Sequence, residues 1–132
     1  MKILIFSLLS FLTTPIFAQR TFEKDGINIE TRKERVIDKN ANDFDYEYEV
    51  LTIKNNTNTS KTVVFHKAAF YNETCWTCEN DEYKVSFTLK PNEIIKGKVT
   101  DRDKGLTVFI KDYSGRIKEE LSDFQLLKFE VK

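Results

Sequence analysis

The sequence predicts an all-β fold, which we expect to be one antiparallel β-sandwich of about seven to eight strands. Apolar and polar residues alternate with period two along most of the chain, a pattern typical of strands that bury one face. Short clusters of Asn, Asp, Ser, Gly and Pro separate these alternating runs at short, regular spacing. Residues 19–132 have the length of one small domain and contain neither an internal repeat nor a linker. We therefore expect a single domain with one hydrophobic core.

Residues 1–18 are predicted to be a secretory signal peptide that is cleaved from the mature chain. Lys2 provides the positive charge, and residues 3–12 form an apolar run broken only by two serines. Ala18 supplies the small residue before a cleavage site at Gln19. The apolar run is shorter than the about 20 residues that a membrane-spanning helix needs. We expect a secreted or periplasmic protein with no membrane span in the mature chain.

The first half of the domain contains two long alternating runs. Residues 19–26 are expected to form a loose lead-in, and the first strand is predicted at residues 27–37. Residues 44–50 alternate aromatic or aliphatic side chains with acidic ones. The apolar phase then shifts by one at Val50-Leu51, which predicts a β-bulge in this strand. The polar run at residues 55–60 is expected to turn the chain.

The second half continues the same pattern, with strands expected at residues 62–70, 83–90, 94–100, 106–110 and 124–131. The clearest alternation places Val85, Phe87 and Leu89 on one face, with polar residues such as Thr88 on the other. A further phase slip is expected at Leu126-Leu127. The predicted core consists of Tyr46, Tyr48, Val63, Phe65, Val85, Phe87, Leu89, Leu106, Val108 and Ile110.

Residues 116–124 are the one segment whose apolar residues fit helical spacing. Ser114 stands where it would cap such a segment. A short helical turn is therefore expected there, before the last strand.

The charge balance excludes some classes of partner. The chain has 21 basic and 21 acidic residues, with the two signs interspersed. Lys2 is the only charged residue in the predicted signal peptide, so the mature chain is close to neutral. Such a surface has no electrostatic basis for binding nucleic acid or an anionic membrane. We expect neither as a partner.

Several short motifs resemble those of small exported bacterial immunoglobulin-like sandwich proteins. They are residues 48–56 (YEVLTIKNN), the Thr-rich turn that follows, residues 85–93 (VSFTLKPNE) and Gly97. The resemblance covers residues 44–110 and implies an immunoglobulin-like arrangement of the strands. Many members of this group have no assigned activity, so the resemblance implies a fold and little about function.

Cys75 and Cys78 enclose Trp76 and Thr77 and form the most distinctive local motif. An even number of cysteines in an exported chain favours a disulfide between them. A redox-active C-x-x-C pair is the alternative, but it needs a thiolate stabilised at a helix N-terminus, and acidic residues flank this motif. We expect a structural disulfide that closes a loop. No metal site is expected, because zinc requires four ligands and His66 is the only imidazole.

Trp76 and Tyr71 are the candidate binding residues. Trp76 is the only tryptophan, and on a short pinned loop it could stack on a sugar or enter a pocket of a partner protein. The favoured interpretation is that Trp76 folds down as a lid over the end of the sandwich.

No catalytic residues and no cofactor are predicted. A single histidine without a nucleophile motif gives no triad, and no pair of carboxylates stands out in an apolar setting. Asp38 and Glu49 match a calcium-loop spacing, but Asp43 stands where that loop needs Gly, so a polar turn is favoured.

These observations favour an exported, non-enzymatic binding or accessory module. Its partner is expected to be an unidentified protein or glycan at the cell surface or in the periplasm. A small thiol-redox or hydrolytic enzyme and a structural subunit of a cell-surface assembly remain as alternatives. A thiol enzyme needs a cysteine of low pKa, whereas an assembly subunit needs an open edge strand that can pair with a partner.

Overall fold

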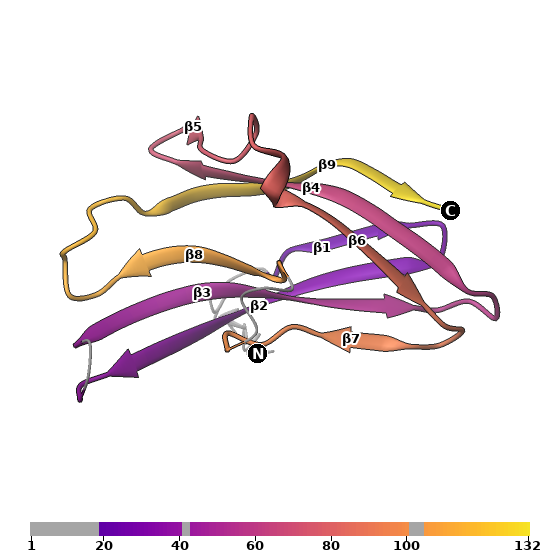
Figure 1. The fold of residues 1–132 in the computed structure, drawn as a ribbon, viewed down its shortest axis with the longest axis horizontal. Helices are drawn as coiled ribbons and strands as arrows, with labels where there is room; N and C mark the ends of the chain where they lie inside the picture. The colour runs from indigo at the N-terminus through magenta and orange to yellow at the C-terminus, as the bar shows by residue number, and fades with distance from the viewer. Residues whose placement is uncertain (1–18, 41–42, 101–104) are drawn as a thin grey trace, which may run out of the picture.

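The computed structural model describes residues 19–40, 43–100 and 105–132 (Figure 1). The predicted signal peptide, part of the calcium-type turn and residues 101–104 lie outside the described residues. Every strand pair is antiparallel, and the described residues contain one 3₁₀ turn but no α-helix. The elements are β1 (Thr21–Lys24), β2 (Ile27–Asp38), β3 (Phe44–Asn55), β4 (Lys61–Tyr71), β5 (Thr74–Cys75), η1 (Asp81–Tyr83), β6 (Lys84–Leu89), β7 (Ile94–Lys96), β8 (Thr107–Asp112) and β9 (Leu121–Val131).

The strands form two antiparallel sheets, which lie one above the other in Figure 1. The first sheet has the order β1-β2-β3, and β7 and β8 pair in turn along the other edge of β3. In the second sheet β4 is central, with β9 on one edge and β5 and β6 on the other. Between the described strands the chain crosses from one sheet to the other three times, from β3 to β4, from β6 to β7 and from β8 to β9. The crossings from β3 to β4 and from β8 to β9 are linked, because β3 pairs with β8 in the first sheet and β4 pairs with β9 in the second.

Both sheets contribute side chains to one core between them. The buried apolar side chains are Ile27, Ile29, Leu51, Ile53, Val63, Phe65, Ala69, Tyr71, Val85, Leu89, Leu106, Val108 and Phe124. This confirms Val63, Phe65, Val85, Leu89, Leu106 and Val108 as core residues. Phe87 is only half-buried and packs against the edge of the cluster.

The predicted core face of β3 was only partly right: Tyr48 is buried at 8% exposure, but neither Tyr46 nor Tyr48 belongs to the cluster between the sheets. Leu51 and Ile53 lie in the core, so period-two alternation turns Tyr46 and Tyr48 to the opposite face of the strand. There the two tyrosine rings pack against each other and against the ring of Phe109. The aromatic residues thus cover the outer face of the first sheet. Both faces of β3 therefore carry hydrophobic side chains, and their hydropathy is similar.

The expected bulge at Val50-Leu51 does not occur in β3. The register between β2 and β3 runs without a shift from Phe44 to Asn55. Val50 and Leu51 are both fully buried because side chains cover both faces of the strand at this point. The irregularity lies in the partner strand, where Ile110 of β8 has no opposite residue. Ile110 is half-buried and does not belong to the core cluster that was predicted to contain it.

The expected loose lead-in at residues 19–26 is instead ordered by strand β1. Phe22 pairs with Ile29 and packs against the core. Asp25 and Gly26 form the turn between β1 and β2, with φ values of 48° and 82°. Two central residues with positive φ are what a two-residue hairpin turn requires, and Asp-Gly is a preferred pair for it.

The helical turn expected at residues 116–124 is also absent. Asp112 organises a turn by accepting hydrogen bonds from the backbone N–H groups of Ser114 and Ile117, and β9 then begins at Leu121. The bonds to Ser114 and the backbone hold the pKa of Asp112 below its usual value. These local side-chain bonds replace the helical bonds that the apolar spacing suggested.

Strand β9 contains the phase slip that the sequence predicts near Leu126-Leu127. Between Val64 and His66 of β4 the partner strand advances by one extra residue, from Glu130 to Leu127. Lys128 lies inside this step and has a φ of 50°. The bulge lies one to two residues after the predicted position.

Candidate functional site

Cys75 and Cys78 form a disulfide. Cys75 lies in β5 and pairs with Phe70 at the end of β4, and the chain continues through a turn rather than a helix. The structure therefore lacks the helix N-terminus that lowers the pKa of a catalytic thiol. This arrangement agrees with a disulfide that closes a loop.

The loop between the two cysteines is hydrogen-bonded to the backbone of β4. Thr77 is 5% exposed, and its hydroxyl accepts a hydrogen bond from the N–H of Ala69 (2.9 Å) and donates one to the carbonyl of Lys67 (2.7 Å). The N–H of Trp76 donates to the carbonyl of Ala69 at 3.0 Å. The disulfide and these bonds fix the backbone that carries Trp76.

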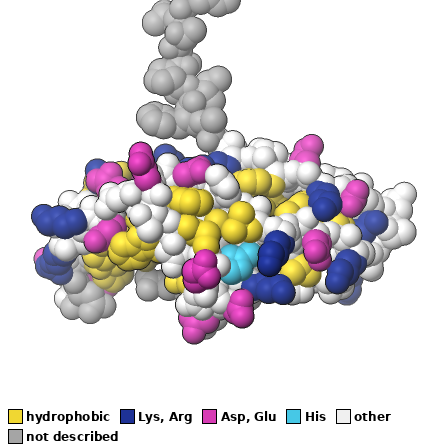
Figure 2. Space-filling view, turned by 90° about the horizontal axis from the view of Figure 1, so that it is seen from above, with side chains coloured by type: hydrophobic (Ala, Val, Ile, Leu, Met, Phe, Trp, Pro, Cys, Tyr) yellow, Lys and Arg dark blue, Asp and Glu magenta, His cyan; other side chains and the backbone are white. Residues whose placement is uncertain are grey.

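His66 also supports this loop. Its Nε2 atom donates to the carbonyl of Thr77 at 2.7 Å. This bond links the histidine ring to the backbone of the disulfide loop. Figure 2 shows the histidine at the border of a hydrophobic patch, with basic and acidic side chains beside it.

Trp76 stands at the surface beside Tyr71. The side chain is 58% exposed, and its ring centroid lies 5.4 Å from that of Tyr71 in an edge-to-face arrangement. The sequence favoured a Trp76 folded down as a lid over the end of the sandwich; its ring does lie against Tyr71, but more than half of the side chain is exposed. The two candidate binding residues lie together, as neighbouring walls of a pocket.

The pocket has a volume of about 280 Å³ and lies between the end of β4, the disulfide loop, β8 and the turn before β9. Most of its lining is aromatic or aliphatic. The lining residues are Lys67, Ala69, Tyr71, Trp76, Thr77, Tyr83, Thr107, Val108, Phe109, Ile117 and Glu119.

Two side chains of β4 reach across the pocket to the edge of β8. The Lys67 ammonium donates to the carbonyl of Thr107 (3.2 Å), and the Tyr71 hydroxyl donates to the carbonyl of Phe109 (2.6 Å). Thr107 and Phe109 are two residues apart, so their carbonyls point the same way from β8. The two bonds hold the edge of the first sheet against the second and occupy acceptors that a pairing strand would use.

Lys67 is the unusual group in this pocket. Its side chain lies on the core face of β4, and the residue is only 6% exposed. Burial lowers its pKa to about 8. Among the described residues no carboxylate forms an ion pair with it, and the nearest aromatic ring is that of Tyr83, 5.8 Å from Nζ. An ammonium has three donors, and one of them is bonded here.

Sequence reasoning missed Lys67 and the residues of β8. The signal was present in β4, because alternation from Val63 and Phe65 places Lys67 on the core face. A lysine at a core position is rare unless it has a partner or a task. The contacts of Thr107 and Phe109 with β4 could not be predicted, because these residues are far from β4 in the sequence. Only the packing of the two sheets brings β8 close to β4.

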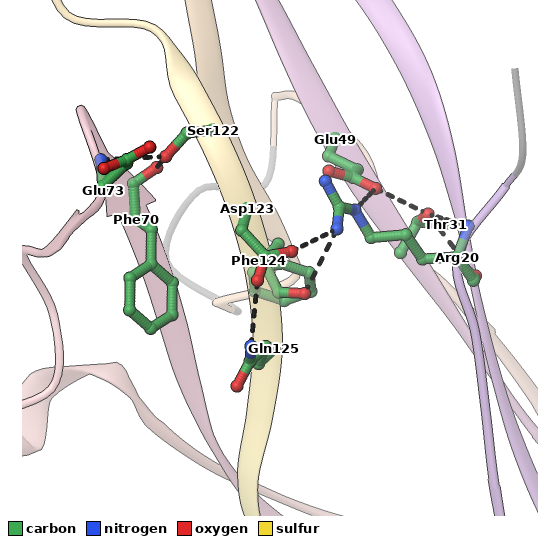
Figure 3. Close-up of polar contacts among 9 residues, drawn as sticks. All are labelled: Arg20, Thr31, Glu49, Phe70, Glu73, Ser122, Asp123, Phe124 and Gln125. Atoms are coloured by element: carbon green, nitrogen blue, oxygen red, sulfur yellow. Dashed lines mark hydrogen bonds and ion pairs between the residues drawn. The ribbon is translucent and has the colours of Figure 1, made fainter.

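A second polar cluster joins Arg20 to three parts of the fold (Figure 3). Arg20 Nε lies 2.9 Å from Glu49 Oε1, and its Nη1 lies 2.9 Å from Asp123 Oδ1. Thr31 donates to the same oxygen of Glu49 at 2.8 Å. Hydrogen bonds from Gln125 and Arg20 keep the pKa of Asp123 below its usual value. The polar groups of this cluster form hydrogen bonds and ion pairs with one another. We therefore interpret the cluster as a structural link between strands rather than as a binding site.

Neither a metal-ligating cluster nor a membrane-spanning helix occurs in the part of the chain that the structure describes. No group of three or more His, Cys, Asp and Glu side chains there could hold a metal ion. None of its helices has the length and apolar character that crossing a bilayer requires.

Comparison with known proteins gives no relative for this chain. No family model, no curated protein and no solved structure matches it.

Proposed function

We propose that this chain is an exported, non-enzymatic binding module whose site is the pocket beside Trp76. The observation that carries the proposal is the construction of this pocket. An exposed Trp76 stands on a loop that a disulfide and Thr77 hold rigid, over a cavity with mainly apolar walls and one buried cation. Concave, apolar sites with a few fixed polar groups are the usual form of ligand pockets.

We infer export from residues 1–18, which have the three parts of a signal peptide. The ligand is then a molecule of the periplasm or the cell surface, either free or displayed by a protein or glycan partner. The disulfide between Cys75 and Cys78 supports this location, since disulfides persist in oxidising compartments.

An immunoglobulin-like fold is part of the same proposal. The linked crossings from β3 to β4 and from β8 to β9 support it, because Greek-key sandwiches place consecutive strands in opposite sheets. The pocket then lies at one end of the two sheets, where such folds carry their binding loops.

The enzymatic and assembly alternatives have weaker support. The pocket lining contains one carboxylate, Glu119, whereas sugar hydrolysis usually employs a pair. The Cys75–Cys78 bond lacks the helix that a thiol-redox site uses. The carbonyls of Thr107 and Phe109 already accept bonds on the edge of β8, which disfavours strand addition there.

The test is a screen of small neutral, anionic, cationic and carbohydrate compounds by saturation-transfer NMR. We expect hits whose signal is lost in Trp76→Ala and kept in Ile94→Ala. Ile94 is a matched control because it is also 58% exposed but lies in β7, away from the pocket lining. Hits that bind Trp76→Ala as well as the wild type, or a screen without hits, would contradict the proposed site.

A further inference from the structure

We propose that the pocket beside Trp76 selects a compact ligand with an apolar body and a single carboxylate, which Lys67 binds. This inference rests on the proposed function and adds the chemical class of the ligand. It depends on the one buried charged group of the pocket and on the apolar surface around it.

Lys67 is a buried cation that the described part of the chain leaves incompletely paired. It is 6% exposed and lines the pocket, and its one hydrogen bond to a described residue is to the carbonyl of Thr107. A buried charge is costly unless a counter-charge and further hydrogen bonds compensate for it. A carboxylate in the pocket would supply both, because it carries the opposite charge and accepts the free N–H groups of the ammonium.

Two of the other polar groups of the lining are bonded within the protein. The Tyr71 hydroxyl donates to the carbonyl of Phe109, and the Thr77 hydroxyl accepts from the N–H of Ala69 and donates to the backbone carbonyl of Lys67. A sugar needs several hydrogen-bonding groups around its ring, whereas most of this lining is aromatic or aliphatic. The pocket therefore fits a ligand with one polar end better than a polyhydroxylated one.

The walls define the rest of the ligand. Trp76, Tyr71, Ile117 and Val108 present aromatic and aliphatic surface to the cavity. Its volume of about 280 Å³ equals that of about nine water molecules, which suits a single substituted ring. Glu119 also lines the pocket, and its negative charge opposes a ligand with a second anionic group.

The experiment compares two probes of equal shape, 4-methylbenzoate and neutral 4-methylbenzamide. The readout is the indole N–H resonance of Trp76, which is unique because the chain has one tryptophan. We expect the benzoate to bind at least about tenfold more tightly, since a hydrogen bond to a charged group outweighs a neutral one by that factor. Lys67→Met should remove the difference between the probes. Lys84→Met, an exposed lysine of β6, should keep it.

A pH series on the wild-type protein tests the same point without a variant. Benzoate affinity should fall as the pH rises from 7 to 10, because Lys67, whose pKa is about 8, loses its proton over this range. Benzamide affinity should stay constant.

Equal affinity for the two probes in the wild type, or unchanged benzoate binding in Lys67→Met, would overturn the carboxylate proposal. If benzamide or the trisaccharide cellotriose shifts Trp76 while benzoate has no advantage, the binding function stands and only its ligand class is wrong. If none of the three probes shifts Trp76 at millimolar concentration, both proposals fail.

Discussion

Lys67 combines two properties at the scale of a single residue. It lies among apolar side chains of the core face of β4, yet its ammonium makes a single hydrogen bond to the residues that the structure describes. Natural cores rarely retain such a group when a hydrophobic residue of the same length would fit. Its retention here costs stability in the free protein, and that cost is measurable.

Replacing Lys67 by Met should stabilise the free protein at pH 7. The pKa of Lys67 is lowered from 10.5 to about 8 by burial, so the unfolded chain binds more protons than the folded one between these values. Wild-type stability should therefore rise as the pH increases from about 8 to about 10.5. Lys67→Met lacks this penalty, which amounts to as much as about 3 kcal/mol at pH 7. Urea unfolding at pH 7 and pH 10 measures it.

The advantage of Lys67→Met should shrink at pH 10, where the wild-type amine is largely neutral. Lys84→Met is the control, since Lys84 is exposed in β6 and its replacement should change stability by less than about 0.5 kcal/mol at both pH values. A stability difference between Lys67→Met and wild type that does not change with pH would show that the amine is not desolvated in the folded state.

How much of the site the sequence predicts depends on how local each feature is. The disulfide follows from the spacing of Cys75 and Cys78, and the placement of Trp76 beside Tyr71 follows from the hairpin that they share. The bond from Lys67 to Thr107 joins residues that are 40 apart and lie in different sheets. Such a contact depends on the packing of the sheets, which alternation alone does not define.

At the scale of the strand, hydrophobic alternation located nearly every element but not always its face. In β6 the faces are correct, because Val85 and Leu89 are buried and Ser86 and Thr88 are exposed. In β3 they are reversed, since aromatic residues cover the outer face as densely as aliphatic ones fill the core. When both faces of a strand are hydrophobic, neither the hydropathy nor the period of the pattern shows which face packs in the core.

Phe87→Ala and Thr88→Ala test the faces of β6. Phe87 is half-buried against the core cluster, so its truncation should cost about 2–3 kcal/mol, less than the about 3–5 typical of a fully buried phenylalanine. Thr88 is exposed and shares a hydrogen bond with Thr62 (3.1 Å), so its truncation should cost less than about 1 kcal/mol. Denaturant unfolding of both variants gives the comparison. A larger loss for Thr88→Ala would mean that the strand is turned the other way.

Removing the disulfide with Cys75→Ser and Cys78→Ser should loosen one loop and leave the fold intact. The closed ring is short, so the loss of cross-linking costs only about 2 kcal/mol of global stability. The N–H of Trp76, which bonds to Ala69, should exchange with solvent much faster, while that of Leu51 in the centre of β3 should change little. Hydrogen exchange followed by NMR separates the two effects. Equal acceleration at both sites would indicate that the disulfide supports the whole domain.

At the scale of the whole molecule, the Arg20 cluster connects β2, β3 and β9. Glu49 is 3% exposed on the core side of β3, and Arg20 is its ion-pair partner. The charge on Glu49 is compatible with burial only while Arg20 and Thr31 hold it.

Arg20→Ala should therefore be among the most damaging substitutions outside the core. It leaves Glu49 buried without a counter-charge, which typically costs about 3–5 kcal/mol. Arg35→Ala is the matched control, because the ion pair of Arg35 with Asp45 is exposed and such pairs contribute at most about 1 kcal/mol. Thermal and urea unfolding of the two variants provide the measurement.

Adding Glu49→Leu to Arg20→Ala should recover much of the lost stability, because no buried charge then remains. A double variant as unstable as Arg20→Ala would place the damage in the packing of Arg20 rather than in its charge.

The tie between Arg20 and Asp123 also has a consequence for the order of folding. The hairpins of β1, β2 and β3 use neighbouring segments and can form while a chain is still growing, but β4 lacks a strand on one edge until β9 arrives. Only then does Arg20 gain its second carboxylate, 103 residues away. A nascent chain therefore has an unpaired edge on β4 until its synthesis passes residue 131. Completion of folding is then governed by slow, long-range strand pairing rather than by local turns.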